Sequence, residues 1–213
     1  MYQFYFFDLD GTITDSSLGI TNSVRYALAK YGIEEPDRKK LYRFIGPPLA
    51  ESFREFYGFP EEQCQKAIRY YREYYREKGI YENQVYDGLE EVLKKLKEAG
   101  KQLVVATSKP EVFAREIIRY FHLDSYFSYV AGMELDGGRG TKAEVIEYAI
   151  CCCGAEDRRE ILMIGDRKHD VIGARQAGID CVGVLYGFGS EEELKEAGAA
   201  GIAASVEDIL KYA

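Results

Sequence analysis

This sequence has few histidines, no long apolar run and fewer basic than acidic residues, and each of these features excludes a class of function. Lys and Arg together number 28 against 36 Asp and Glu, which gives a formal net charge of −8. Such a chain repels the phosphates of nucleic acid, so a nucleic-acid partner is not expected. No segment approaches the roughly 20 apolar residues of a membrane span, and the first residues lack the basic and apolar regions of a signal peptide. We therefore expect a cytoplasmic protein without a membrane partner.

Soft metal ligands are also few. The two histidines, His122 and His169, cannot make a three-histidine zinc site. Three of the five cysteines, Cys151, Cys152 and Cys153, are contiguous, a spacing that suits neither a disulfide framework nor a zinc site. We interpret the cysteines as free thiols that serve as small buried apolar side chains. The sequence assigns no further role to this run or to His169.

Short apolar runs alternate with helical patterns along most of the chain. The runs are residues 4–7, 103–106, 161–164 and 181–184. Continuous apolar runs of this length are typical of strands covered on both faces, and the amphipathic patterns between them indicate helices. The alternation predicts an α/β fold built on a doubly wound parallel sheet.

One long stretch lacks this alternation. From residue 15 to about residue 80 the chain shows helical patterns, broken by glycine and proline, without a convincing apolar strand. We predict a small all-α cap domain at residues 15–81, inserted into a core made of residues 1–14 and 82–213.

Acidic residues follow two of the predicted strands. Asp8 and Asp10 come directly after the first apolar run, and Asp166 and Asp170 follow the run at 161–164. Side chains two apart in a strand point the same way, so Asp8 and Asp10 are expected to project into one site. The carboxyl ends of parallel strands meet at one sheet edge, where four carboxylates repel each other unless a cation is bound. An oxygen-rich site of this kind favours Mg²⁺.

Two further residues are suited to binding phosphate oxygens. Thr107 follows the run at 103–106, and Lys142 lies in the first turn of a helix that Thr141 and Glu144 are predicted to cap. A hydroxyl and an ammonium at such positions match the oxygens of a phosphoryl group.

These residues carry a resemblance to a known family. The segments FFDLDGT at residues 6–12, VATS at 105–108 and GDRKHD at 165–170 resemble the first, second and fourth motifs of the haloacid-dehalogenase-like (HAD) superfamily, and Lys142 falls where the third motif lies. The insert between the first two motifs resembles the helical C1 cap of the phosphoglycolate phosphatase-like group. The resemblance spans nearly the whole chain and implies a HAD, Rossmann-like core.

The resemblance implies a phosphatase mechanism. Asp8 would attack phosphorus and form an aspartyl-phosphate, while Asp10 would act as general acid and then as general base. Mg²⁺ would be held by the Asp8 carboxylate, the Asp10 backbone carbonyl and Asp166, with Asp170 helping directly or through water.

The same resemblance implies a set of substrate contacts. Thr107, the Ser108 backbone and Lys142 would neutralise the transferring phosphoryl group. Arg43 and Gly46 are candidates for substrate contacts from the cap, because an arginine offers a planar fork for carboxylate or phosphate and residues 46–48 form a stiff turn.

Two other functions are compatible with parts of this motif set. A non-enzymatic receiver module also combines acids with Thr and Lys, but its acceptor Asp comes from a later strand than its acidic pair and it lacks a helical cap. A C1-capped sugar phosphomutase shares all four motifs and is the stronger alternative. The expected substrate is a small phosphorylated metabolite: phosphoglycolate, a nucleoside 5′-monophosphate, a sugar phosphate and pyrophosphate all fit. The oligomeric state is left open.

Overall fold

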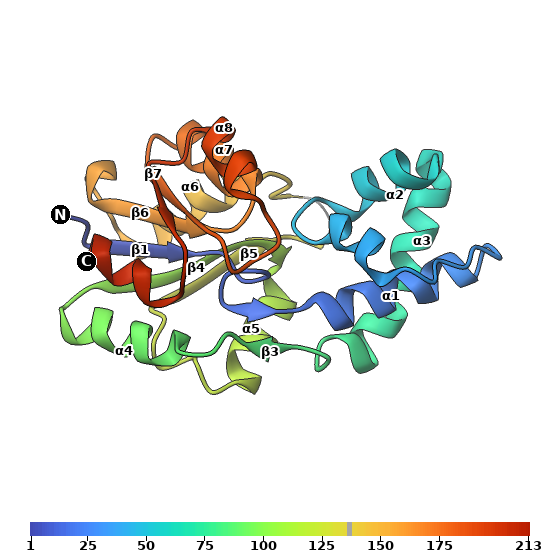
Figure 1. The fold of residues 1–213 in the computed structure, drawn as a ribbon, viewed down its shortest axis with the longest axis horizontal. Helices are drawn as coiled ribbons and strands as arrows, with labels where there is room; N and C mark the ends of the chain where they lie inside the picture. The colour runs from blue at the N-terminus through green and yellow to red at the C-terminus, as the bar shows by residue number, and fades with distance from the viewer. Residues whose placement is uncertain (136–137) are drawn as a thin grey trace. The chain divides into compact units, whose positions relative to one another are not determined.

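The computed structural model describes residues 1–135 and 138–213, which divide into two compact units (Figure 1). Unit 1 comprises Met1–Thr14 and Val85–Ala213, and unit 2 comprises Asp15–Gln84. The second boundary falls after Gln84 rather than after residue 81, where the sequence placed it. The short strands β2 (Thr14–Asp15) and β3 (Gln84–Val85), which the sequence did not predict, pair in a two-stranded sheet.

Unit 1 is built on a six-stranded sheet in the order β5-β4-β1-β6-β7-β8, in which every pair is parallel. Its strands are β1 (Phe4–Phe7), β4 (Gln102–Pro110), β5 (Tyr129–Met133), β6 (Ile161–Gly165), β7 (Asp180–Val184) and β8 (Gly201–Ala203). The predicted doubly wound parallel sheet is confirmed. Because β1 lies between β4 and β6, the strand order reverses beside it, which is where open α/β sheets place their ligands.

Helices cover both faces of this sheet (Figure 1). They are α4 (Leu89–Glu98), α5 (Glu111–Tyr120), α6 (Lys142–Cys153), α7 (Lys168–Gln176) and α8 (Glu191–Ala197), with short 3-10 helices η3 (Arg158–Glu160) and η4 (Glu207–Tyr212). Apolar side chains of α6 and α7 pack in one cluster with Phe6, Val104 and Met163 of the central strands. This packing holds the carboxyl ends of β1, β4 and β6 rigidly beside one another.

Between the short strands at its two ends, unit 2 consists of helices and the turns that join them. The helices are α1 (Ser17–Ala29), the 3-10 helix η1 (Arg38–Phe44), α2 (Leu49–Tyr57), α3 (Glu61–Tyr74) and a π-helical turn η2 (Tyr75–Gly79). Aromatic side chains fill its interior, where Phe53 packs edge-on against Phe44 at 5.1 Å and stacks on Phe59 at 5.8 Å between ring centroids. Across the described residues, every helix of the chain is too short or too polar to cross a bilayer.

Helix α1 and the π-helical turn η2 approach each other closely inside unit 2. A Cβ on Gly19 would lie 1.9 Å from the carbonyl oxygen of Gly79, and Ser23 donates a hydrogen bond to the Gly19 carbonyl at 2.7 Å. The opposing atom is backbone and cannot turn away, so only glycine fits at this crossing.

Gly19→Ala is therefore expected to destabilise the protein by about 1–3 kcal/mol, although alanine in a helix ordinarily gains about 1 kcal/mol over glycine. Denaturant unfolding followed by circular dichroism measures the effect. Arg25→Ala, at an exposed position of the same helix, is the matched control. A Gly19→Ala variant as stable as wild type would show that the two backbones are not this close.

Candidate active site

Asp8 stands at the end of the central strand and is held there by the backbone. Its amide donates a hydrogen bond to the carbonyl of Ile164 at 2.9 Å, which continues the pairing of β1 with β6. The chain then turns sharply, and the carbonyl of Leu9 accepts hydrogen bonds from the backbone amides of residues 12–14. Gly11 adopts a φ of +85°, and a Cβ there would lie 2.2 Å from an oxygen of Asp166. Glycine is thus required at this turn both for its conformation and for space.

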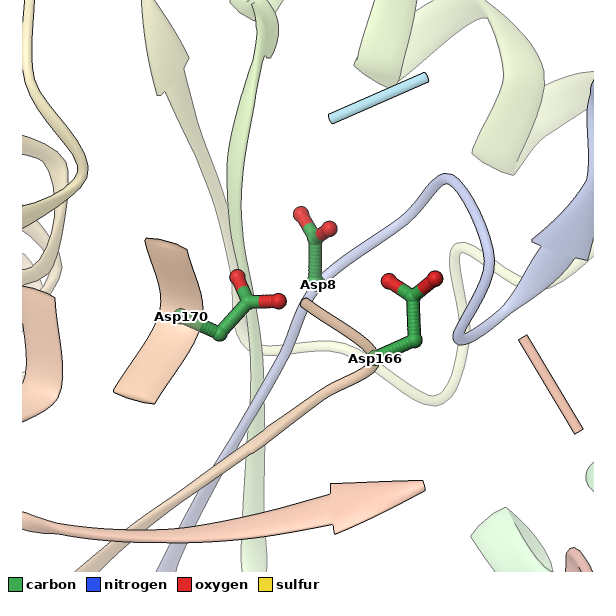
Figure 2. Close-up of side chains that lie close together, drawn as sticks. All are labelled: Asp8, Asp166 and Asp170. Carbon is green, nitrogen blue, oxygen red and sulfur yellow. The ribbon is translucent and has the colours of Figure 1, made fainter. Parts of the chain in front are cut away.

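Three carboxylates meet at this edge of the sheet (Figure 2). Asp8 follows β1, Asp166 follows β6, and Asp170 lies in the first turn of α7. One oxygen from each lies within 4.8 Å of the other two. The residues are 5%, 0% and 2% exposed, so water screens their charges poorly.

Lys142 bridges two of these carboxylates. Its Nζ lies 2.8 Å from Oδ1 of Asp8 and 2.6 Å from Oδ1 of Asp170. The predicted capping box of Thr141 and Glu144 is present and starts α6 at Lys142. Burial alone would lower the pKa of Lys142, but the adjacent carboxylates outweigh it and raise the pKa above its ordinary value. Lys142 therefore stays charged at neutral pH.

One ammonium is too little positive charge for this cluster. Burial, and then the neighbouring carboxylates of Asp170 and Asp8, raise the pKa of Asp166 well above its ordinary value. Burial also raises the pKa of Asp170 to about 6, against the opposing effect of Lys142. Both pKa shifts have the direction expected where several carboxylates share a buried site.

The Asp166 carboxylate is half satisfied by hydrogen bonds. Oδ2 accepts from the amide of Phe188 at 2.7 Å, whereas Oδ1 is buried and has no hydrogen-bond partner in the described part of the chain. A buried carboxylate oxygen without a donor is costly unless a cation binds it. Three clustered carboxylates and one unpartnered oxygen fit a hard divalent cation with oxygen ligands.

The loop after β7 holds Asp166 in place. Gly187 and Gly189 pack directly on this residue: a Cβ at Gly187 would lie 2.4 Å from the Asp166 Cβ, and one at Gly189 would lie 1.9 Å from its carbonyl oxygen. The Tyr186 hydroxyl donates to the carbonyl of Thr12 at 3.0 Å, which ties the loop to the turn after β1. The sequence did not reveal that this loop holds Asp166, because the group that binds the Asp166 carboxylate is the backbone amide of Phe188, and a backbone amide leaves no signal in the sequence.

Asp10 pairs with a lysine. The Nζ of Lys109 lies 2.8 Å from Oδ1 and 2.6 Å from Oδ2 of the Asp10 side chain. Lys109 was missed by sequence reasoning. Its one signal is its position two residues after Thr107 at the end of the same strand.

The other predicted contacts come from other elements. Thr107 is buried at the end of β4, where its Oγ1 accepts from the amide of Lys109 at 3.2 Å, and Ser108 beside it is half-buried. Within unit 2, the guanidinium of Arg43 lies 4.1 Å from the ring centroid of Phe56. Gly46 has a φ of +102° in its turn.

The cysteines are free thiols, as predicted. Cys64 and Cys181 are buried, but Cys151 and Cys152 are exposed, so the interpretation of all five as buried apolar residues was wrong. Three consecutive residues of one helix point in different directions and cannot all face the core.

The chain is similar to known proteins over most of its length. A family model described as haloacid dehalogenase-like hydrolase matches residues 5–184. A 5′-nucleotidase of Pseudomonas aeruginosa is 51% identical over 194 residues, which cover 91% of this chain and 87% of that protein. The tyrosine-protein kinase PtkA of Mycobacterium tuberculosis is 41% identical over 187 residues, covering 88% of this chain and 63% of PtkA. A crystal structure of a predicted phosphatase from Clostridium acetobutylicum superposes with a TM-score of 0.96 at 50% identity, covering 100% of this chain and 98% of that one.

Proposed function

Because the chain belongs to the haloacid dehalogenase-like hydrolase family and is one of its phosphatases, we propose that it hydrolyses a nucleoside 5′-monophosphate through an aspartyl-phosphate on Asp8. One observation carries the mechanism. Asp8 ends the central strand beside two other buried carboxylates, and Lys142 contacts its Oδ1. An anchored, buried carboxylate at a strand end is suited to attack phosphorus with its other oxygen.

The acidic cluster is the proposed magnesium site. Asp8, Asp166 and Asp170, with the backbone carbonyl of Asp10, are the residues that would hold Mg²⁺. When bound, the ion supplies positive charge to the phosphoryl oxygens and to the carboxylates around it. Oδ1 of Asp166 supports this assignment, because it is buried and no group in residues 1–135 and 138–213 hydrogen-bonds to it.

The remaining residues act on the phosphoryl group and on protons. Lys142 orients Asp8 and neutralises a phosphoryl oxygen, with the Thr107 hydroxyl and the Ser108 amide as further donors. Asp10 protonates the leaving alkoxide and later takes a proton from the attacking water. Arg43 and Gly46 stay our proposals for substrate contacts outside the phosphoryl group.

The nucleoside monophosphate is the substrate favoured by the relatives. The P. aeruginosa 5′-nucleotidase is 51% identical, whereas the phosphoglycolate phosphatase 1 of the same organism is 28% identical. Phosphoglycolate, sugar phosphates and pyrophosphate are the substrates to be compared with it.

The test is a panel of these compounds assayed for phosphate release with Mg²⁺ and with a chelator. Nucleoside 5′-monophosphates are expected to give the highest kcat/KM, and chelation is expected to lower turnover by at least about 10²-fold, reversibly on adding Mg²⁺. Mg²⁺ is also expected to raise the melting temperature of wild type but not of Asp166→Asn. Activity that survives chelation would contradict the magnesium site, and isomerisation of a sugar phosphate without phosphate release would favour the phosphomutase.

A further inference from the structure

Lys109 is a buried cation that the mechanism above leaves unused. We propose that it is a positioning residue, which holds the Asp10 carboxylate in the orientation needed to protonate a poor leaving group. Lys109 thereby determines how well the enzyme hydrolyses alkyl phosphate esters, as distinct from activated ones. This inference rests on the proposed function, since it concerns the acid in that reaction.

The contact between Lys109 and Asp10 is close and enclosed. Nζ reaches both carboxylate oxygens, at 2.8 and 2.6 Å, and the two side chains are only 5% and 11% exposed. A single ammonium that contacts both oxygens restrains rotation of the carboxylate about its last bond. A pair so buried is costly to desolvate, and removing one partner would leave the other uncompensated. The pairing therefore fixes where the Asp10 oxygens point.

The backbone is shaped to bring Lys109 to this position. The pairing of β4 with β5 shifts register between Thr107 and Pro110, and Thr107 accepts a hydrogen bond from the Lys109 amide within this irregular segment. On β5, a Cβ at Gly132 would lie 2.6 Å from the Lys109 carbonyl oxygen. Bulges of this kind re-aim side chains near active sites. The irregular end of β4 therefore places Lys109 beside Asp10, and the glycine on β5 leaves room for the backbone there.

The site thus has two lysines with different partners. Lys142 contacts Asp8 and Asp170, the proposed nucleophile and metal ligand, whereas Lys109 contacts Asp10, the proposed acid. Proton transfer needs the acid within about 2.6–3.2 Å of the leaving oxygen, so the orientation of its carboxyl group limits the rate. A ribose alkoxide must be protonated as it leaves, but a nitrophenolate leaves without a proton. Loss of Lys109 should therefore affect the two kinds of ester differently.

The test compares Lys109→Met with wild type on a nucleoside 5′-monophosphate and on p-nitrophenyl phosphate. The ratio kcat/KM is measured because it reports the steps up to formation of the aspartyl-phosphate. We expect a loss of about 10²-fold on the nucleotide and a change within about threefold on the nitrophenyl ester. Inhibition by inorganic phosphate should be unchanged. Lys94→Met, an exposed lysine of α4, is the matched control and should behave as wild type on both esters.

Two further variants keep the test decisive. In an Asp10→Asn background, Lys109→Met is expected to cause no additional loss on the nucleotide, because the residue acts through Asp10. Lys109→Arg keeps the charge but changes its position, so it should restore part of the nucleotide activity. If Lys109→Met does not fold, Lys109→Arg takes its place and must show the same selective loss, in smaller degree.

Several results would overturn the inference. Equal losses on both esters with weaker phosphate inhibition would make Lys109 a ligand of the phosphoryl group, and an undiminished nucleotide rate would remove it from the reaction. If the losses caused by Lys109→Met and Asp10→Asn were fully additive in the double variant, Lys109 would act independently of Asp10. A wild-type enzyme that releases phosphate from neither ester would instead defeat the proposed function itself, whereas an active wild type with a non-selective Lys109 variant defeats this inference alone.

Discussion

Asp8→Asn is expected to abolish phosphate release, with a loss in kcat on the order of 10⁴-fold or more. An amide cannot form the aspartyl-phosphate, so the reaction loses its two-step path. The substitution keeps the shape of the side chain, and it removes one of three crowded carboxylates while Lys142 retains Asp170 as a partner. The variant should therefore fold and, without metal, melt no lower than wild type.

Single-turnover kinetics and thermal melts measure these effects. Asp124→Asn, an exposed acidic residue, is the matched control and should retain wild-type turnover. Mg²⁺ should stabilise the Asp8→Asn variant less than wild type, because one proposed ligand is weakened. Turnover within tenfold of wild type would exclude Asp8 as the nucleophile.

Lys142→Met is expected to lower kcat/KM by about 10³-fold on nucleotide and nitrophenyl esters alike. The ammonium contacts Asp8 and Asp170, and neither role depends on the leaving group. Its loss also leaves three buried carboxylates without their cation, which should destabilise the metal-free protein. The packing has made room for this side chain, since a Cβ on Gly173 of α7 would lie 2.8 Å from the Lys142 stem.

Parallel assays on the two esters separate Lys142 from Lys109. A uniform loss for Lys142→Met beside a selective loss for Lys109→Met would establish two different roles for the two lysines. Lys94→Met serves again as the control. A loss for Lys142→Met confined to the nucleotide would show that this residue acts on proton transfer and contradict the role proposed for it.

The sheet and its acidic edge were predictable because each depends on a local pattern. The apolar runs at Phe4–Phe7 and at residues 161–164 each form a strand, and parallel strands necessarily bring their carboxyl ends to one edge. Asp8 follows the first run directly and Asp166 follows the second after one glycine, so their meeting follows from topology alone. The edge strands β5 and β8 were missed, since neither is buried along its whole length.

The partners of these acids were not predictable in the same way. Asp10 and Lys109 are 99 residues apart, and their contact depends on the irregular end of β4 and on a glycine in the neighbouring strand. Phe188 binds Asp166 through its amide, which every residue but proline carries. The periodicity of a sequence indicates which face of a strand or helix a residue occupies, but it does not indicate which side chains from distant segments contact each other.

The central claim is that Asp8 carries the phosphoryl group, and the most direct measurement is to identify the residue that becomes labelled during turnover. Enzyme mixed with substrate and Mg²⁺, quenched in acid and reduced with tritiated borohydride, should release the bound phosphate and contain tritium-labelled homoserine at position 8 in its peptide map. The tritium label should be absent when Mg²⁺ is chelated and in Asp8→Asn. A tritium label on any other residue, or turnover without a covalent species on the same time scale, would contradict the account.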